Sequence, residues 1–265
     1  MAYPLAGGGL ALFVTFSAAA QFTQWTSDSG GNGHWFEVVT TSSGISWSAA
    51  RDDAAFRGGS LASVTSASKN QFLFSLSVAT PSAWLLGEPF SVGPWLGGYA
   101  IDGYWGAWDS GESWDFTAWL PGEPCCGGEE PCLSYFNFTP LNPDGTSGPA
   151  PYWGDRANFA FGVGCVSYIV EYSSNPDCDS DGVNDIVAIA GGLASDLNRD
   201  SIPDSCQCLA DLNMDGSVNG ADLAVLLGFW GPASGAFPQA DIVKTGGVDG
   251  ADLAYLLGSW GQCPN

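Results

Sequence analysis

Apolar residues in the first two thirds of the chain follow two patterns. Trp47, Ala50 and Ala54 recur at helical spacing, so the sequence predicts a helix over 46–58. A second helix is predicted in "SASKNQFLFSLS", starting near Ser66. Further on, the apolar runs are short and separated by Gly and Pro, and the last is a predicted strand, "CVSYIVEY". Two helices followed by irregular β-structure predict an α+β domain.

The last third of the chain carries one segment twice. "DLNMDGSVNGADLAVLLGFWG" begins at Asp211, and "DIVKTGGVDGADLAYLLGSWG" begins at Asp241. The second half of each copy is a nearly identical apolar helical stretch, whereas two polar positions of the first copy, Asn213 and Asp215, are replaced in the second. The duplication therefore predicts helix-on-helix packing in both copies and a full set of oxygen ligands in the first alone.

Charge limits the possible partners. The 265 residues include 6 Lys and Arg against 28 Asp and Glu, a formal net charge of -22. A charge of this sign repels phosphate backbones, so we expect no nucleic-acid partner. Every acidic residue from Asp177 to Asp252 is an aspartate, and three stretches repeat Asp or Asn at a spacing of two residues, beside Gly or Asn. A surface that only confers solubility mixes both charge signs, so this pattern favours cation-binding loops.

The N-terminal segment and the cysteines indicate export. "MAYPLAGGGLALFVTFSAAAQF" is apolar and contains a small-residue cleavage signature, which predicts a signal peptide over 1–20, with a membrane anchor as the alternative. The stretch is short and Gly-rich for a spanning helix, so no membrane span is expected after signal removal. The 8 cysteines lack zinc-site spacing and indicate disulfides in a secreted, extracellular or cell-surface protein.

Residues typical of catalysis are sparse. His34 is the single histidine, no nucleophile elbow is present, and the aspartates follow metal-loop spacing. We therefore expect a binding or structural protein and not an enzyme.

Short motifs occur in a fixed order between residues 33 and 174. They are Trp47, Gly58-Gly59 and Leu61-Ala62, followed by "WLGGY", "WDSGESWDFTAW", "PGEP", "YWGD" and "YIVEY". In this order they resemble a C-type lectin-like domain. The resemblance implies a double-looped α+β fold, whose long loop binds calcium and sugar in many members.

The same resemblance assigns cysteine partners. The family's first disulfide falls here on Ala54 and Val170, and both residues are apolar. Its second disulfide implies a bridge between Cys132 and Cys165. Cys125 and Cys126 are left over, and they either bridge each other or reach another chain.

The family's calcium and sugar motif is altered in this chain. Its Glu-Pro-Asn and Asn-Asp elements become Glu123-Pro124-Cys125 and Gly154-Asp155. The candidate ligands that remain are Glu123 and Asp155, with Glu129 or Glu130 as replacements. Calcium takes six to eight oxygens, and two amide ligands are missing. Two interpretations stay open: a thinned calcium–sugar site, or a stretch that shapes the loop around a cis-proline at Pro124. The ligand count favours the second.

Two aspartate-rich stretches follow the spacing of an EF-hand-type calcium loop, numbered from position 1 to position 12. The candidate ligands of the first are Asp177, Asp179, Asp181, Val183 by its carbonyl, and Asp185. Those of the second are Asp196, Asn198, Asp200 and Asp204. Position 12, normally a carboxylate, is Ala188 in the first stretch. Both resemble the thrombospondin type 3-like calcium repeats of bacterial extracellular stalks.

The third stretch has the most complete ligand set. Its candidate ligands are Asp211, Asn213, Asp215, Ser217 by its carbonyl, Asn219 and Asp222. Asp222 also opens the Leu-rich helical stretch, and the repeated loop–helix unit resembles a type I dockerin. The resemblance implies two antiparallel loop–helix units and a cohesin-like partner. Family members use hydroxyl residues at positions 10 and 11, but this chain has Gly220-Ala221 and Gly250-Ala251 there, so a self-packed cap is the alternative.

Cysteines flank these loops. Cys208 precedes the repeated unit and Cys263 follows it, so we predict a bridge that ties its ends together. A Cys178–Cys206 bridge would brace the first two loops.

The chain is thus expected to comprise five segments and to act in recognition. They are a signal peptide (1–20), an N-terminal linker (21–32), a C-type lectin-like domain (33–174), calcium-loop repeats (175–207) and a dockerin-like module (208–265). The expected function is a secreted calcium-binding, lectin-like recognition protein for a glycan or protein ligand, with a C-terminal module for docking or self-assembly. The alternative is a structural subunit of an extracellular filament or matrix that uses the lectin-like fold for subunit packing.

Overall fold

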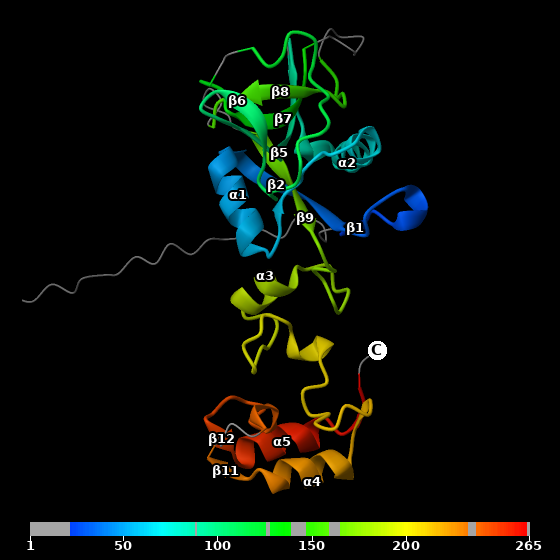
Figure 1. Ribbon diagram of the computed structural model, residues 1–265, viewed down its shortest axis with the longest axis vertical. Helices are drawn as coiled ribbons and strands as arrows, with labels where there is room; N and C mark the ends of the chain where they lie inside the picture. The colour runs from blue at the N-terminus through cyan, green and yellow to red at the C-terminus, as the bar shows by residue number, and fades with distance from the viewer. Residues whose placement is uncertain are drawn as a thin grey trace, which may run out of the picture.

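A computed structural model describes residues 22–87, 89–125, 128–138, 147–158, 165–232 and 237–263. The predicted signal peptide lies outside these residues. The head, residues 22–172, occupies one end of the chain's long axis, and helices α4 (Gly220–Gly228) and α5 (Gly250–Gly258) occupy the other. Helix α3 (Asp185–Ala190) lies between them (Figure 1).

The head is built on one nine-stranded sheet whose main path runs β1-β2-β9-β5-β7-β8, with β3, β4 and β6 paired at its side. The strands are β1 (Thr23–Gln24), β2 (Trp35–Ile45), β3 (Ser60–Leu61), β4 (Leu85–Leu86), β5 (Ser91–Ile101), β6 (Tyr104–Trp108), β7 (Cys132–Asn137), β8 (Trp153–Arg156) and β9 (Cys165–Tyr172). All pairs are antiparallel except the Trp95–Tyr168 contact between β5 and β9, which is parallel.

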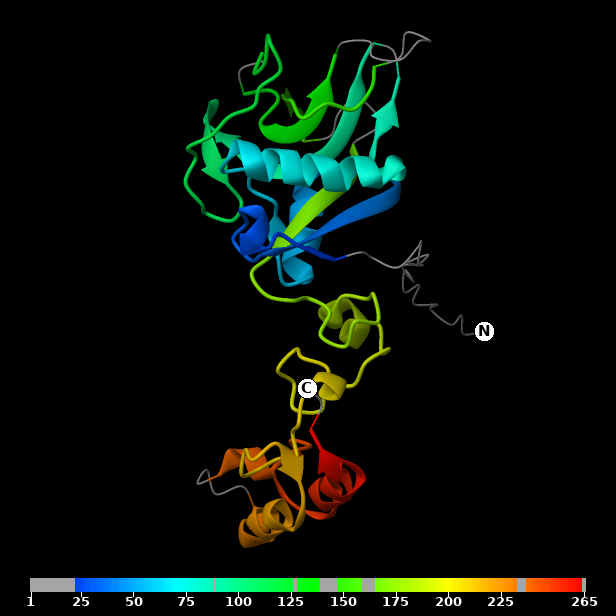
Figure 2. The ribbon, with the colours of Figure 1, turned by 90° about the vertical axis from the view of Figure 1, so that its right-hand side faces the viewer.

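Both predicted head helices are present. Helix α1 spans Trp47–Phe56 and α2 spans Ala67–Ala79. Each begins after a serine, Ser46 or Ser66, whose side chain accepts a hydrogen bond from a first-turn N–H. Helix α2 lies across the sheet (Figure 2). The mixed α/β architecture therefore agrees with the pattern of apolar positions.

Two apolar clusters fill the head. One contains Trp153, Trp108 and Trp84 with the inner residues of α2. The other contains Ala54 and Val170, the two positions at which the resemblance places a disulfide. Both are completely buried. Packing thus occupies the place of the missing bond.

The N-terminal residues that the sequence suggested as a linker pack on the head. Strand β1 pairs with β2, with Thr23 opposite Phe36. Trp25 is buried and stacks on Phe72 of α2 at a centroid distance of 5.6 Å. Strand β1 is too short to show the alternation of apolar and polar residues that predicts a strand, so Trp25 is the one sequence feature that indicates packing on the head.

The two copies of the repeated segment pair with each other through short strands. Strand β10 (Ser217–Val218) pairs with β13 (Gly261–Gln262), and β11 (Gly231–Pro232) pairs with β12 (Gly247–Val248). Leu226 and its counterpart Leu256 are fully buried in one shared cluster. Each copy therefore completes the other, as expected from the conserved packing half.

The remaining short helices are η1 (Ser27–Ser29), η2 (Pro81–Ala83), η3 (Asp204–Cys206) and η4 (Pro238–Ala240). Within the described ranges, no helix has the length and apolar character needed to cross a bilayer.

Candidate functional site

Four loops repeat one backbone conformation. We name them loop 1 (177–188), loop 2 (196–207), loop 3 (211–222) and loop 4 (241–252). Position 4 has a positive φ of 52° to 61° in residues that are not glycine: Ser180, Arg199, Met214 and Lys244. Position 6 has a positive φ of 70° to 101° in Gly182, Ser201, Gly216 and Gly246. Non-glycine residues rarely adopt this region, so its recurrence at one position indicates a common loop structure.

The carboxylate at position 1 is held inside each loop. Asp177 accepts hydrogen bonds from the N–H groups of Asp181 (3.1 Å) and Gly182 (3.0 Å). The same pair of bonds, from positions 5 and 6, reaches Asp196, Asp211 and Asp241. These bonds fix a carboxylate at the sharp turn, where an EF-hand-type loop places its first ligand.

The carboxylate that closes the loop differs between the pairs. In loop 1, Asp185 at position 9 accepts from the Cys178 N–H at 3.2 Å, and in loop 2 Asp204 does the same for Leu197 at 3.0 Å. In loops 3 and 4 the closing residue is at position 12, where Asp222 and Asp252 are fully buried. Asp185 at position 9 thus closes loop 1, although Ala188 at position 12 has no carboxylate.

Loop 2 has a further polar contact that the aspartate spacing did not indicate. Gln207, at position 12, donates to Asp200 (2.6 Å) and accepts from Asn198 (3.0 Å). Burial acts to raise the pKa of Asp200, but hydrogen bonds from Gln207, Ile202 and Asn198 outweigh it and lower that pKa. The amide therefore stabilises the ionised form of a candidate ligand.

Carboxylates crowd together in loop 1. Asp177, Asp179 and Asp185 offer oxygens that lie within 4.8 Å of one another. Burial, together with the neighbouring carboxylates, raises the pKa of Asp185 to about 6 and also raises that of Asp177. Oxygen-only donors at this spacing fit a hard cation such as calcium. A bound cation would offset the repulsion that these shifts record.

Loop 4 keeps the shape with fewer acids. Val243 stands at position 3, and the Thr245 hydroxyl at position 5 donates to the Gly247 carbonyl at 3.1 Å. The Lys244 ammonium donates to the Pro238 carbonyl at 3.0 Å. Hydrogen bonds within the loop therefore replace part of the oxygen set of loop 3.

The altered lectin motif gathers two of its four candidate ligands. Glu123 and Asp155 lie within 4.8 Å of each other with the Cys125 sulfur, and Asp155, which is buried, accepts from the Cys125 N–H at 3.0 Å. Burial, the hydrogen bond to Asp155 and its charge raise the pKa of Glu123 to about 8. The Glu123–Pro124 bond is cis. Two carboxylates fall short of the six to eight oxygens that calcium takes, so the described residues of this motif do not fit the ion.

Glu129 and Glu130 lie outside that group. Burial raises the pKa of Glu130, and the charges of nearby carboxylates raise it further. The tryptophans nearby pack in or against the core: Trp108 is buried and stacks on Trp114 at 4.4 Å, and Trp105 and Trp119 are partly buried against the same cluster. They therefore do not form an open stacking platform.

An exposed hairpin tip was missed at the sequence level. Ile101 and Tyr104 flank the turn between β5 and β6, and both are exposed, Tyr104 to 81%. Asp102 (φ 51°) and Gly103 (φ 82°) make the turn, and the Asp-Gly pair is a hairpin signal that could have found it. A Cβ at Gly128 would lie 3.4 Å from the Gly103 Cα, so the tip lies beside the stretch that leads into Glu129 and Glu130.

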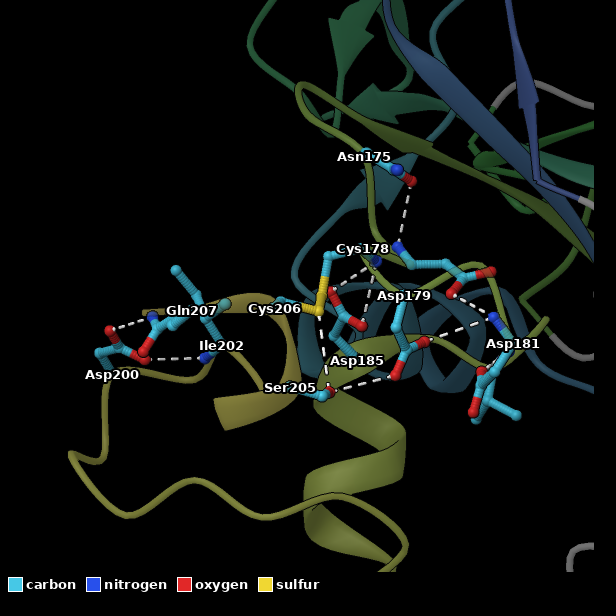
Figure 3. The surroundings of a disulfide bond; sticks show 12 residues. Asn175, Cys178, Asp179, Asp181, Asp185, Asp200, Ile202, Ser205, Cys206 and Gln207 are labelled. Atoms are coloured by element: carbon cyan, nitrogen blue, oxygen red, sulfur yellow. Dashed lines mark hydrogen bonds between the residues drawn. A yellow bond between two sulfur atoms is a disulfide. The ribbon is translucent and has the colours of Figure 1, made fainter. Parts of the chain in front are cut away.

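Two disulfides brace the loops at the predicted cysteines. Cys178 is bonded to Cys206, and Cys208 to Cys263. Figure 3 shows the first bond, where Ser205 of loop 2 also donates to Asp179 of loop 1 at 3.3 Å. Loops 1 and 2 are thus joined covalently and by a hydrogen bond.

The bridge that the family resemblance implies between Cys132 and Cys165 is absent, and both residues are buried free thiols. Strand β5 lies between their strands, β7 and β9. Cys125 takes part in a disulfide, whereas Cys126 lies outside the described residues.

Comparisons with known proteins identify structural neighbours. No protein-family model matches the chain, and no curated protein matches it. Human lithostathine is similar at 16% identity, with 64% of this chain and 99% of that chain covered and a TM-score of 0.40. The cow C-type carbohydrate-recognition domain of CD23, solved in the presence of an oligosaccharide, is similar at 19% identity, with 61% of this chain and 98% of that chain covered and a TM-score of 0.38. A calcium-independent type II antifreeze protein is similar at 18% identity, with 51% of this chain and 85% of that chain covered and a TM-score of 0.35. The chain is thus a mixed α/β protein with C-type lectin-like structural neighbours.

Proposed function

We propose that the chain is a secreted, calcium-binding recognition protein. In this proposal the lectin-like head binds a carbohydrate or protein ligand, and the dockerin-like module docks or assembles. One observation carries the calcium role: loops 1, 2 and 3 combine Asp or Asn at positions 1, 3 and 5 with the same positive-φ positions and the same bonds to the position 1 carboxylate. This combination, repeated three times, supports a common ligand rather than chance surface charge.

The candidate ligands would act as oxygen cages. Loop 3 would hold calcium with Asp211, Asn213, Asp215, Asn219 and Asp222 and with the Ser217 carbonyl. The ion supplies positive charge, which offsets carboxylate repulsion and stabilises the folded loop. Loop 4, with Val243 and Thr245 in place of two ligands, serves as scaffold.

The head's recognition role is supported by the exposed hairpin tip. Ile101 and Tyr104 present apolar side chains on a tight turn, beside the stretch from Gly128 to Glu130. Exposed aromatic side chains on a rigid support make contact surface at low entropic cost. The tip and this stretch are therefore the head surface at which we expect the ligand.

The C-terminal module offers a duplicated apolar surface. Leu227 and Trp230 are about half exposed, and so are their counterparts Leu257 and Trp260. The acidic residues of the two helices, Asp222 and Asp252, are fully buried, so this surface is uncharged. Exposed apolar patches typically mark contact sites, which supports docking to a cohesin-like partner or self-assembly. The same surface favours the second candidate function, a structural subunit.

A glycan array with and without a chelator tests the recognition role. Binding that is lost when Tyr104→Ser is introduced supports the head as a lectin, and calcium dependence ties it to the loops. No glycan binding, together with concentration-dependent sedimentation that Leu227→Lys and Leu257→Lys abolish, would favour the structural subunit. Leu193→Lys, at an exposed leucine between loops 1 and 2, is the matched control.

A further inference from the structure

Loop 1 is docked on the head. The Asn184 side chain, which is buried, donates to the Arg57 carbonyl at 3.1 Å. The next head residue, Gly58, is in contact with α3, because a Cβ there would lie 2.7 Å from the Ile186 Cδ1. Arg57 and Gly58 form the corner between α1 and β3, so loop 1 is attached to the head by side-chain contacts as well as by the chain.

The residues that make this contact also close the loop. Asn184 accepts from the Val187 N–H at 3.1 Å and so caps α3. Its neighbour Asp185 accepts from the Cys178 N–H and so closes loop 1. Because the two residues are adjacent, the closed loop conformation is the one that aims Asn184 at Arg57.

The receiving corner is itself well fixed. The Arg57 guanidinium is paired with Glu37 at 3.2 Å and with Asp53 one helical turn earlier. The Tyr172 hydroxyl donates to Glu37 at 2.7 Å, which connects the corner to β9 at the centre of the sheet. A change in the position of the Arg57 backbone would therefore be felt in the core of the head.

Position 12 of loop 1 lies inside a helix. Ala188 is buried within α3, where an EF-hand-type loop has a carboxylate. In loop 1, α3 begins at position 9, and its Ile186 contacts Gly58 of the head. Loop 1 thus combines a shortened ligand set with a docking contact that loops 3 and 4 lack.

We propose that loop 1 and the head form one calcium-linked folding unit, in which cation binding at loop 1 stabilises the α1–β3 corner through Asn184 and Ile186. The proposal rests on the calcium role proposed above for the loops. Without a cation, repulsion among Asp177, Asp179, Asp181 and Asp185 favours an open loop, which moves Asn184 from Arg57. Coupling is reciprocal, so the docked head raises the calcium affinity of loop 1 by the same factor.

Hydrogen exchange of the full chain tests the coupling. The amides of residues 53–62 are followed by mass spectrometry in calcium and in EDTA, and bound ions are counted by native mass spectrometry. At calcium 100 times above its Kd, opening of the corner should slow by up to about 100-fold. Asp181→Ala should remove one ion and abolish this protection. Asp200→Ala, at the same position of loop 2, should remove one ion and leave the protection intact.

A second variant separates contact from binding. Ile186→Ala keeps every candidate ligand and the helix cap, so it should keep the ion in loop 1 but lose most calcium-dependent protection of 53–62. Ile202→Ala, at an exposed isoleucine of loop 2, is the control and should behave as the unmodified chain. Equal exchange in calcium and EDTA while loop 1 holds its ion would overturn the coupling and leave the proposed function standing. An ion count that Asp181→Ala does not change would overturn the calcium site of loop 1 and with it the coupling, and a full chain that binds no calcium would overturn the proposed calcium role as well.

Discussion

The Lys69 ammonium lies 2.7 Å from the Glu171 carboxylate, and their side chains are only 1% and 4% exposed. The pair joins α2 to the central strand β9. Glu171 also accepts from the Ser63 N–H at 3.2 Å and contacts the His34 ring at 2.8 Å. A charge buried to this extent is tolerated because it is paired and hydrogen-bonded.

Removing one partner of this pair should destabilise the head. Lys69→Met leaves the Glu171 charge buried without its cation, and we expect a loss of about 3–5 kcal/mol in the free energy of unfolding by urea. Glu112→Gln is the control, because that carboxylate lies 3.4 Å from Lys69 and is 35% exposed. Its removal should cost less than about 1 kcal/mol. Similar losses in the two variants would contradict a dominant buried pair.

Calcium removal should lower the melting temperature. A ligand that binds only the folded state adds about 2.7 kcal/mol per site at 100 times its Kd, so EDTA should shift the calorimetric transition downward. Magnesium at equal concentration should restore less stability, because Mg²⁺ demands smaller, octahedral sites and dehydrates reluctantly. A transition that is the same in calcium and in EDTA would remove the basis for the calcium role.

Loops 3 and 4 should differ in ion count. Asp215→Ala removes position 5 of loop 3 and should lower the calcium number from native mass spectrometry by one. Thr245→Ala makes the equivalent change in loop 4 and should leave that number unchanged. If both variants lose an ion, loop 4 binds calcium and is more than scaffold.

The buried aspartate of loop 4 should be structural. Asp252 accepts from the N–H groups of Val243 (3.0 Å) and Asp249 (2.8 Å). Asp252→Ala should cost roughly 1–3 kcal/mol in thermal unfolding even in EDTA, because it leaves buried donors unpaired. Asp249→Asn, which keeps a side-chain cap on α5, should cost only about a few tenths of a kcal/mol. A loss confined to calcium-containing buffer would instead identify Asp252 as a ligand.

Cys132 and Cys165 should resist thiol reagents in the native protein. Burial raises the pKa of each thiol to about 12, so the unreactive protonated form prevails at pH 8. Peptide mapping after iodoacetamide treatment should find both residues labelled only in denaturant. Rapid native labelling of Cys132 would place it at the surface and contradict its position in the sheet.

Local chemistry explains which features the sequence could predict. Aspartates spaced by two residues and glycine at position 6 describe a ligand loop by themselves, and a capping serine with periodic apolar residues describes α1 and α2. The residue that closes loops 1 and 2 follows from the same sequence, because position 12 is Ala188 in loop 1 and Gln207 in loop 2, which leaves the position 9 aspartate as the closing carboxylate.

Long-range contacts explain what the sequence could not reveal. "SASKNQ" looks like a polar helix start, and Lys69 is buried only because β9 brings Glu171 beneath it. The free thiols of Cys132 and Cys165 likewise differ from the bridge that the motif resemblance implies. The contact between Asn184 and Arg57 likewise joins residues 127 positions apart.

The Cys208–Cys263 bond has a mechanical consequence. Its two Cα atoms lie 5.3 Å apart although the residues are separated by 55 positions. Tension applied along the chain between the head and residue 263 therefore crosses the bond and bypasses α4 and α5. An unbridged segment of that length would extend by roughly 180–200 Å when pulled straight. With the bond intact this length is not released, so the paired helices can keep their shape under a load that stretches the residues between the head and Cys208.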